Sequence, residues 1–269
     1  MGNYKLLAID IDGTLIKGDQ TISPRTREAL IHAQERGVRV VITTGRPTFG
    51  AAPFADELRL ADFGSYVISF NGSEIYNWAT KERIYSVLLD KDIKPYVYDC
   101  TKRCGFQIIA YIGQNVVAED PDNEYVKFSS KRNKMPIRTV QNFLTDTDGA
   151  QPKFLIVGDP EPLHTLELEM AAHLKGKAEV YRSEPFFLEI VPHGIDKSTG
   201  LSVLCAELGI SRENIIAFGD GFNDVSMIEY AGMGVAMGNA QQVVKERADY
   251  ITLSNEEDGI AEVVERFCS

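Results

Sequence analysis

The polar side chains best suited to chemistry stand where short apolar runs of the sequence end. Four such positions occur, at Asp10, at Thr44, at the Asn71-Gly72 turn and at Asp220. Carboxylates serve as nucleophiles, as general acids and bases, and as hard oxygen ligands for metal ions. A lone Asp-Ile-Asp such as residues 10–12 is most often a turn. The Gly-Thr pair that follows it, and the apolar run before it, favour a functional site instead.

The apolar runs before these residues have the length and composition of buried strands. They cover residues 5–9, 38–43, 66–70 and 215–218. Ser23-Pro24 is typical of a helix start, and Gly37 is typical of that helix's end. Ligands of open parallel sheets bind beyond the carboxyl ends of the strands, so the polar groups can converge there.

Strands and helices alternate again in the last third of the chain. Helices are predicted at residues 199–208, from about 223, at 240–247 and at 256–267, with strands around 235 and at 250–251. Such alternation predicts a parallel sheet with helices on both faces. The predicted fold class is therefore α/β, with a Rossmann-like, doubly wound core.

The middle of the chain has a different pattern. A hairpin is predicted from residues 106–111 and 115–118, strands at 153–157, 178–182 and 186–191, and a helix at 160–174. Residues 120–150 are polar and resist assignment. The pattern is typical of an α+β insert that splits an α/β domain, so we predict a core of residues 1–83 and 193–269 and an inserted domain at 84–192.

Composition and charge narrow the class of protein. The 269 residues are 44% hydrophobic and 25% charged, which is ordinary for a globular chain. The formal net charge of −11 disfavours nucleic acid and anionic membranes as partners. We expect a cytoplasmic protein without a signal peptide or membrane span, whose four scattered cysteines are reduced. An anionic substrate must then be attracted locally, by a metal ion and a few basic groups.

Four motifs in order resemble those of the haloacid dehalogenase superfamily. They are Asp10-Ile-Asp12-Gly-Thr14, Ile42-Thr-Thr44-Gly-Arg46-Pro47, Lys197, and Gly219-Asp220-Gly-Phe-Asn223-Asp224. The large insert between the second and third motifs is similar to that of the Cof-type branch, whose members carry a C2 cap. Later stretches, including Phe186–Ile190 and Met227–Gly232, look like those of bacterial sugar phosphatases in that branch. Each motif is weak alone, but coincidence cannot easily place all four in this order.

The resemblance implies a phosphatase that acts through an aspartyl-phosphate. Uncatalysed phosphate-monoester hydrolysis requires rate accelerations of up to about 10²¹-fold. Asp10 is implied as the nucleophile, which divides one difficult step into two easier ones. Asp12 is implied as the general acid for the leaving oxygen and then as the base for the attacking water.

The resemblance also implies a Mg²⁺ cofactor and a phosphate site. The implied metal ligands are Asp10, the backbone carbonyl of Asp12, and Asp220, with Asp224 in contact with metal-bound water or another ligand. The residues implied to bind phosphate or substrate are Thr44, Gly45, Arg46, Asn71, Lys197 and Asn223, of which Thr44 and Lys197 also act in catalysis. Two roles stay open: Arg46 contacts substrate or pairs with a carboxylate, and Asn223 binds phosphate or orients Lys197.

Other functions are compatible with parts of the pattern. A transport ATPase with an aspartyl-phosphate is disfavoured by the lack of apolar spans and by Asp12, where such pumps carry Thr. A phosphosugar mutase or phosphotransferase would use the same nucleophile. A binding protein without activity would ordinarily have lost Asp10 or Asp12, and both are present.

The expected substrate is a small phosphorylated metabolite. A sugar phosphate is favoured, with pyridoxal phosphate and flavin mononucleotide as alternatives. Because the core motifs recognise only phosphate and metal, we hypothesise that the inserted domain closes over the site and selects the substrate. A monomer or weak homodimer is expected.

Overall fold

The computed structural model describes residues 4–147 and 149–268. Two compact units make up the chain. The first contains the chain up to Tyr85 and again from Asp196 onward, and the second contains Ser86–Ile195. Among the described residues, no helix is long and apolar enough to cross a membrane.

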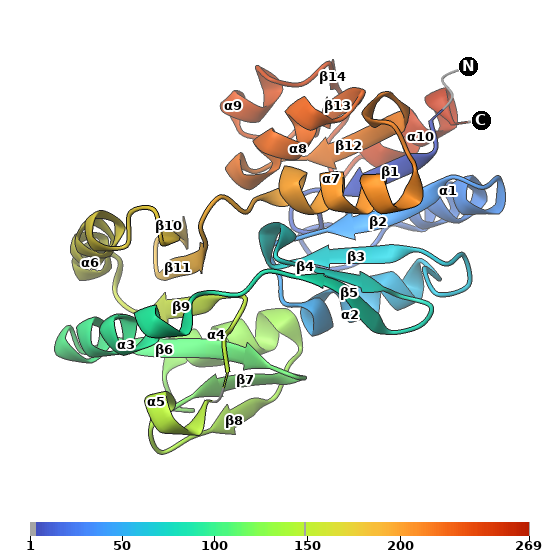
Figure 1. Cartoon of the computed structure of the whole chain (residues 1–269). Coiled ribbons are helices and arrows are strands. Elements are labelled where there is room, and N and C mark those ends of the chain that lie inside the picture. The colour runs from blue at the N-terminus through green and yellow to red at the C-terminus, as the bar shows by residue number, and fades with distance from the viewer. Residues whose placement is uncertain (1–3, 148, 269) are drawn as a thin grey trace. The chain divides into compact units, whose positions relative to one another are not determined.

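The first unit is built on an eight-stranded sheet with the order β14-β13-β12-β1-β2-β3-β4-β5 (Figure 1). The strands are β1 (Leu6–Ile9), β2 (Arg39–Thr43), β3 (Tyr66–Ser69), β4 (Glu74–Asn77), β5 (Glu82–Ser86), β12 (Ile215–Gly219), β13 (Met233–Ala236) and β14 (Tyr250–Ile251). The six strands from β14 to β3 are parallel. The α/β fold with a parallel core is therefore confirmed. The antiparallel pairing of β4 with β3 was not predicted.

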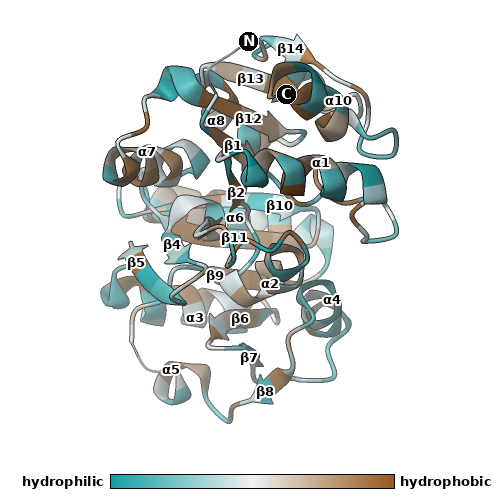
Figure 2. Cartoon of the chain, turned by 90° about the vertical axis from the view of Figure 1, so that its right-hand side faces the viewer, coloured by the Kyte–Doolittle hydropathy of each residue, from teal (hydrophilic) through white to brown (hydrophobic). Residues whose placement is uncertain are grey.

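Helices cover both faces of this sheet. They are α1 (Pro24–Glu35), α2 (Thr48–Glu57), α7 (Lys197–Leu208), α8 (Val225–Tyr230), α9 (Gln242–Lys245) and α10 (Gly259–Phe267), with short 3-10 turns η1 (Phe70–Gly72), η3 (Arg212–Asn214) and η4 (Phe222–Asp224). Side chains of a strand alternate between faces, so Leu7 and Ile9 pack with α1, α2 and α10. Leu6 and Ala8 pack on the other face with α7. In Figure 2, α1 carries both hydrophilic and hydrophobic bands, as expected for a helix with one buried side.

The chain order of the sheet reverses beside β1. Strands β1, β2 and β3 follow one another in one direction, whereas β12, β13 and β14 follow one another in the other direction. Neighbouring loops at such a reversal leave in opposite directions and open a crevice at the carboxyl ends of the strands. The loops that follow β1 and β12 carry Asp10 and Asp220, so the topology places these two carboxylates at the reversal.

Several predicted helix limits were wrong. The helix predicted from residue 256 begins at Gly259, because Asp258 has a left-handed backbone with φ of 63°. The helix predicted at 240–247 is only the short α9. The helix predicted from 199 begins at Lys197, with the Asp196 side chain accepting from the Thr199 amide as its cap. Helix α2 was not predicted, since Pro53 lies inside it.

The second unit contains a six-stranded sheet with the order β10-β11-β9-β6-β7-β8. Its elements are η2 (Lys91–Ile93), α3 (Lys94–Arg103), β6 (Gln107–Ile112), β7 (Asn115–Ala118), α4 (Glu124–Asn133), β8 (Ile137–Thr139), α5 (Phe143–Asp146), β9 (Phe154–Val157), α6 (Pro160–His173), β10 (Ala178–Glu184) and β11 (Phe187–Pro192). All strand pairs are antiparallel except β7 with β8. One face packs Ile108, Ile156 and Ile190 against α3 and α6.

Gly72 lets the end of η1 meet the start of α7, which carries Lys197. Its φ is +102°, and a Cβ atom there would lie 2.0 Å from the Asp196 carbonyl oxygen. We predict that Gly72→Ala lowers the free energy of unfolding by about 3 kcal/mol, from left-handed strain plus the backbone clash. Gly37→Ala is the matched control, because Gly37 also has a positive φ (+89°) but nothing lies within 4 Å of its Cβ position. Urea unfolding of both variants checks this, and equal losses would contradict the role assigned to the close approach.

Candidate active site

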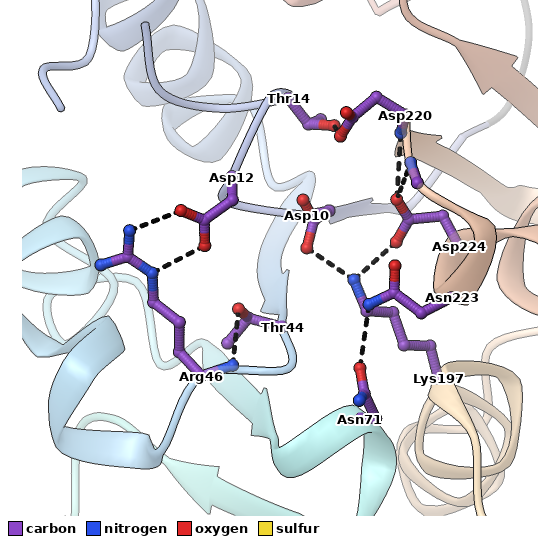
Figure 3. Close-up of polar contacts among 11 residues, drawn as sticks. Asp10, Asp12, Thr14, Thr44, Arg46, Asn71, Lys197, Asp220, Asn223 and Asp224 are labelled. Atoms are coloured by element: carbon purple, nitrogen blue, oxygen red, sulfur yellow. Dashed lines mark hydrogen bonds and ion pairs between the residues drawn. The ribbon is translucent and has the colours of Figure 1, made fainter. Parts of the chain in front are cut away.

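The centre of the site is a buried lysine between two aspartates (Figure 3). Lys197 has no exposed surface, and its Nζ lies 2.5 Å from Oδ1 of Asp10 and 2.5 Å from Oδ1 of Asp224. Asp10 directly follows β1, and its amide continues the strand ladder by donating to the Phe218 carbonyl at 3.1 Å. The three side chains thus come from β1, from the start of α7 and from the turn after β12.

The charges of this cluster perturb one another. Burial raises the pKa of Asp10, and the nearby Asp224 and Asp220 carboxylates raise it further, whereas Lys197 lowers it. Burial also raises the pKa of Asp220, to about 6, with Asp224 adding to the rise. For Lys197, burial opposes the charged form, but the two aspartates outweigh it and the pKa lies above its usual value. The cluster therefore contains more negative charge than its one ammonium group offsets.

Asp220 and Asp224 are fixed by short polar contacts. Thr14 Oγ1 donates to Oδ1 of Asp220 at 2.9 Å. Oδ2 of Asp224 accepts from the amides of Asp220 and Gly221, at 3.0 and 2.9 Å. Gly13 lies against Asp220, where a Cβ atom would approach Oδ2 to 2.3 Å, so only glycine fits at this place in the loop. These contacts fix the orientation of both carboxylates without a bound ligand.

Asp12 lies beside this cluster and is paired with Arg46. The guanidinium donates from Nε to Oδ2 of Asp12 at 2.7 Å and from Nη2 to Oδ1 at 2.6 Å. The Arg46 side chain is 4% exposed and the Asp12 side chain 28% exposed, and the guanidinium stacks over the Phe54 ring at 5.3 Å. Two-point pairing with a planar guanidinium sets both the position and the rotation of a carboxylate. Of the two roles left open for Arg46, the geometry supports pairing with a carboxylate.

A second set of predicted residues lies together at the ends of β2 and β3. The Thr44 amide donates to the Ile68 carbonyl at 2.9 Å, and its Oγ1 accepts from the Arg46 amide at 3.1 Å. Asn71 has a left-handed backbone with φ of 53°, and its Oδ1 accepts from Nδ2 of Asn223 at 3.0 Å. Gly45 lies against the same Asn71 side chain. A strained residue that connects two loops is typical of a functional site.

The fold therefore brings the predicted residues into two adjoining groups. One group contains Asp10, Lys197, Asp220 and Asp224, and the other contains Thr44, Asn71 and Asn223, with the Asp12–Arg46 pair also at the site (Figure 3). Gly45 joins the second group through its contact with Asn71. Residues that were not singled out also contribute. Thr14, noted only as part of a motif, orients Asp220, and Gln20 contacts Arg46. Neither contact could be predicted from a local sequence pattern, because each joins residues that are distant along the chain.

The acidic group suits a divalent cation. Asp10, Asp220 and Asp224 each offer an oxygen within 4.8 Å of the others. Three carboxylates in a partly buried place, facing a single ammonium group, carry excess negative charge that a bound cation would offset. Carboxylate oxygens are the hard ligands that Mg²⁺ prefers. The residues present therefore fit the predicted metal.

The chain belongs to the haloacid dehalogenase-like hydrolase family, whose model it matches over residues 7–264. This confirms the resemblance inferred from the four motifs. The chain is 36% identical to the 5-amino-6-(5-phospho-D-ribitylamino)uracil phosphatase YcsE of Bacillus subtilis, over 97% of this chain and 95% of that protein. Two solved structures are similar over nearly all of both chains. A haloacid dehalogenase-like hydrolase from Bacteroides thetaiotaomicron is 50% identical with a TM-score of 0.95, covering 98% of this chain and 99% of that one. The subclass IIB sugar phosphatase BT4131 is 30% identical with a TM-score of 0.84, covering 98% of each chain.

The charge imbalance predicts that Mg²⁺ stabilises the fold. At a Mg²⁺ concentration about 100-fold above Kd, binding adds about 2.7 kcal/mol to the free energy of unfolding. Asp220→Asn should abolish this gain and at the same time make the metal-free protein more stable, because one of three crowded charges is gone. Thermal unfolding with MgCl₂, against KCl at equal ionic strength, measures both effects. Asp62→Asn, at an exposed position, is the control that should keep the full Mg²⁺ gain, and an undiminished gain in Asp220→Asn would contradict the assignment.

Proposed function

We propose that the chain is a Mg²⁺-dependent phosphatase of a small phosphorylated metabolite, acting through an aspartyl-phosphate on Asp10. The observation that carries the proposal is the Asp10–Lys197–Asp224 cluster at the reversal of the sheet, beside the paired Asp12. A nucleophilic carboxylate, a second carboxylate two residues away and a buried ammonium group suit phosphoryl transfer through a covalent intermediate. Membership of a hydrolase family with phosphatase relatives supports the same reaction.

The first half of the reaction transfers the phosphoryl group to the protein. A carboxylate oxygen of Asp10 attacks phosphorus, and the bond from phosphorus to the ester oxygen breaks. The leaving oxygen takes a proton from the Asp12 carboxyl group, so no unstable alkoxide is released. Lys197 keeps Asp10 oriented and offsets its charge as the anionic phosphate approaches.

The second half returns the protein to its starting state. A water molecule attacks the phosphorus of the aspartyl-phosphate, and Asp12, now a carboxylate, accepts the water proton. The bond between Asp10 and phosphorus breaks, and inorganic phosphate leaves. Thr44, the Gly45 amide, Asn71 and Asn223 are proposed to bind the phosphoryl oxygens.

Mg²⁺ would be held by the carboxylates of Asp10 and Asp220 and the backbone carbonyl of Asp12, with Asp224 supporting it. When bound, it neutralises phosphate charge so that the carboxylates and the substrate can come together. The other roles belong to the chain's own residues. Asp224 holds Lys197 and the amides of the Asp220 turn, and Thr14 holds Asp220.

The substrate class is proposed from the relatives. One solved neighbour is a sugar phosphatase, and one relative acts on a ribityl phosphate carried by a uracil ring. Both leaving groups are alkoxides on polyhydroxylated carbon chains, so we propose sugar and sugar-alcohol phosphates as the first class. Pyridoxal phosphate and flavin mononucleotide are the next candidates. We propose that the second unit provides the selection, because the motif residues of the first unit recognise phosphate and metal alone.

Phosphate release from a panel of these esters with Mg²⁺ tests the proposal. Wild type should release phosphate, and Asp10→Asn should lose about a thousand-fold or more in kcat/KM, because no covalent intermediate can form. Chelation of the metal should give a comparable loss, whereas Asp62→Asn should match wild type. Acid-quenched protein should contain phosphate in an acyl-phosphate linkage at Asp10.

The main alternative is a phosphotransferase or phosphosugar mutase with the same nucleophile. It shares the trapped aspartyl-phosphate but passes the phosphoryl group to a sugar hydroxyl instead of water. Labelled product sugar phosphate, formed without release of inorganic phosphate when sugar acceptors are added, would favour it over hydrolysis.

A further inference from the structure

Gln20 has a backbone conformation that its residue type disfavours. It is the last loop residue of a tight hairpin in which the Gln20 amide donates to the Lys17 carbonyl and the Lys17 amide donates to the Thr21 carbonyl, both at 2.9 Å. Its φ is +67°, in the left-handed region. Three-residue hairpin loops commonly end on such a residue, and glycine or asparagine suits the position best. Glutamine keeps this conformation here although glycine or asparagine would adopt it with less strain.

The Gln20 side chain ends on Arg46. Its Oε1 accepts from Nη2 of Arg46 at 2.9 Å, and the same nitrogen donates to Oδ1 of Asp12 at 2.6 Å. The guanidinium is thus held along its Nη2 edge by Gln20 and over its face by Phe54, while it grips both oxygens of Asp12. A guanidinium fixed in its plane can hold only one rotation of the carboxylate that it pairs with.

The hairpin does not need the Gln20 side chain to keep its place. Asn255 Nδ2 donates to the Ile16 carbonyl at 2.8 Å, and the Gly18 amide donates to Oε1 of Glu256 at 2.7 Å. Asp19 Oδ1 accepts from the Thr21 amide at 3.0 Å and closes the turn. The backbone under Gln20 is anchored from both sides, so the side chain acts on Arg46 from a fixed base.

We propose that Gln20 is a positioning residue for Asp12, acting through Arg46. It fixes the guanidinium so that Arg46 holds both oxygens of Asp12 in place. The oxygen that carries the proton can still accept from the guanidinium while its O–H donates to the leaving oxygen. The P–O bond breaks as the new bond from Asp10 to phosphorus forms, and the electron pair of the broken bond takes the Asp12 proton. The inference rests on the proposed phosphatase function and adds a residue to it.

The test compares two esters that need this proton differently. The leaving group of an alkyl phosphate is an unstable alkoxide, so its departure requires a proton from the acid. The leaving group of p-nitrophenyl phosphate is a stable phenolate, which departs without that proton. The ratio kcat/KM reports the steps up to cleavage of the ester bond. It is therefore sensitive to proton donation by Asp12 and not to the later attack of water. The alkyl ester is the best sugar phosphate of the panel above.

Gln20→Gly and Gln20→Asn are the informative variants. Both residues suit a left-handed backbone, so neither variant adds backbone strain and both should fold. Neither reaches Arg46, since asparagine is one methylene shorter. We expect kcat/KM for the alkyl phosphate to fall about five- to ten-fold, as for a lost charge-assisted hydrogen bond, and to change less than about two-fold for p-nitrophenyl phosphate.

Two further variants calibrate the result. Asp12→Ala should show the same ester dependence with a larger fall, because it removes the acid itself. Lys81→Gly changes another exposed non-glycine residue of positive φ (61°) in the same unit and should leave both esters at wild-type rates.

Equal losses on the two esters would overturn the inference, because Gln20 would then act in phosphate binding or folding. Wild-type rates on both esters in Gln20→Gly and Gln20→Asn would overturn it as well. If wild type hydrolyses neither ester, the proposed function fails, and the positioning role fails with it. The wild-type assay therefore separates failure of the proposed function from failure of the positioning role alone, because in the latter case wild type still hydrolyses the esters.

Discussion

A lysine ammonium group without solvent exposure must be surrounded by acceptors, because an unpaired charge is too costly to bury. In this protein the acceptors are carboxylates of Asp10 and Asp224, each 2.5 Å from Lys197 Nζ. The requirement ties together three segments that are far apart along the chain: the end of β1, the start of α7 and the turn after β12. Most other features of the site serve to keep these three segments in place.

The sheet topology brings two of these three segments together, the end of β1 and the turn after β12. Because the chain order reverses between β1 and β12, the two strands lie side by side while their following loops diverge, and Asp10 and Asp220 end up at the same edge. The start of α7 is brought in by close backbone contact. Gly200 and Gly72 pack so tightly that a side chain on either would meet the other segment's backbone. A lysine at the first residue of such a helix is placed by backbone geometry as much as by its own ion pairs.

Residues with a left-handed backbone also occur at the same edge. Phe70, Asn71 and Gly72 are three consecutive residues with positive φ, directly after β3, and Gln20 is another near Asp12. Strain of this kind persists only where the surrounding contacts determine the conformation. At Asn71 the contacts are the Thr44 carbonyl and the Asn223 side chain, and at Gln20 they are the hairpin and Arg46. These residues therefore connect neighbouring loops of the site, Asn71 to the turn that carries Asn223 and Gln20 to Arg46.

Much of the architecture could be predicted from the sequence because its signals are local. Apolar runs ending in Asp10, Thr44 and Asp220 indicated strands that deliver polar groups, and their alternation with helices indicated a parallel sheet. Where local signals are weak, prediction failed. Residues 120–150 are polar and contain only short elements, α4, β8 and α5, whose hydrophobic patterns are weak. Helix α2 was missed because it contains a proline, which is rare inside helices. Strands β4 and β5 were both missed. Strand β5 is an exposed, polar edge strand, shown largely teal in Figure 2, so it lacks the apolar run that indicated the buried strands.

What the sequence by itself determined is the set of chemical groups and their order along the chain, since residue types and motif spacing are properties of the chain. The choice of partner for each group was decided only by the tertiary structure. Lys197 pairs with two aspartates 187 and 27 residues away, and Arg46 reaches back 34 residues to Asp12. Gln20 meets Arg46 only because the hairpin folds over it. Contacts over such separations depend on how strands and loops are arranged in three dimensions, and no local pattern of residues encodes that arrangement.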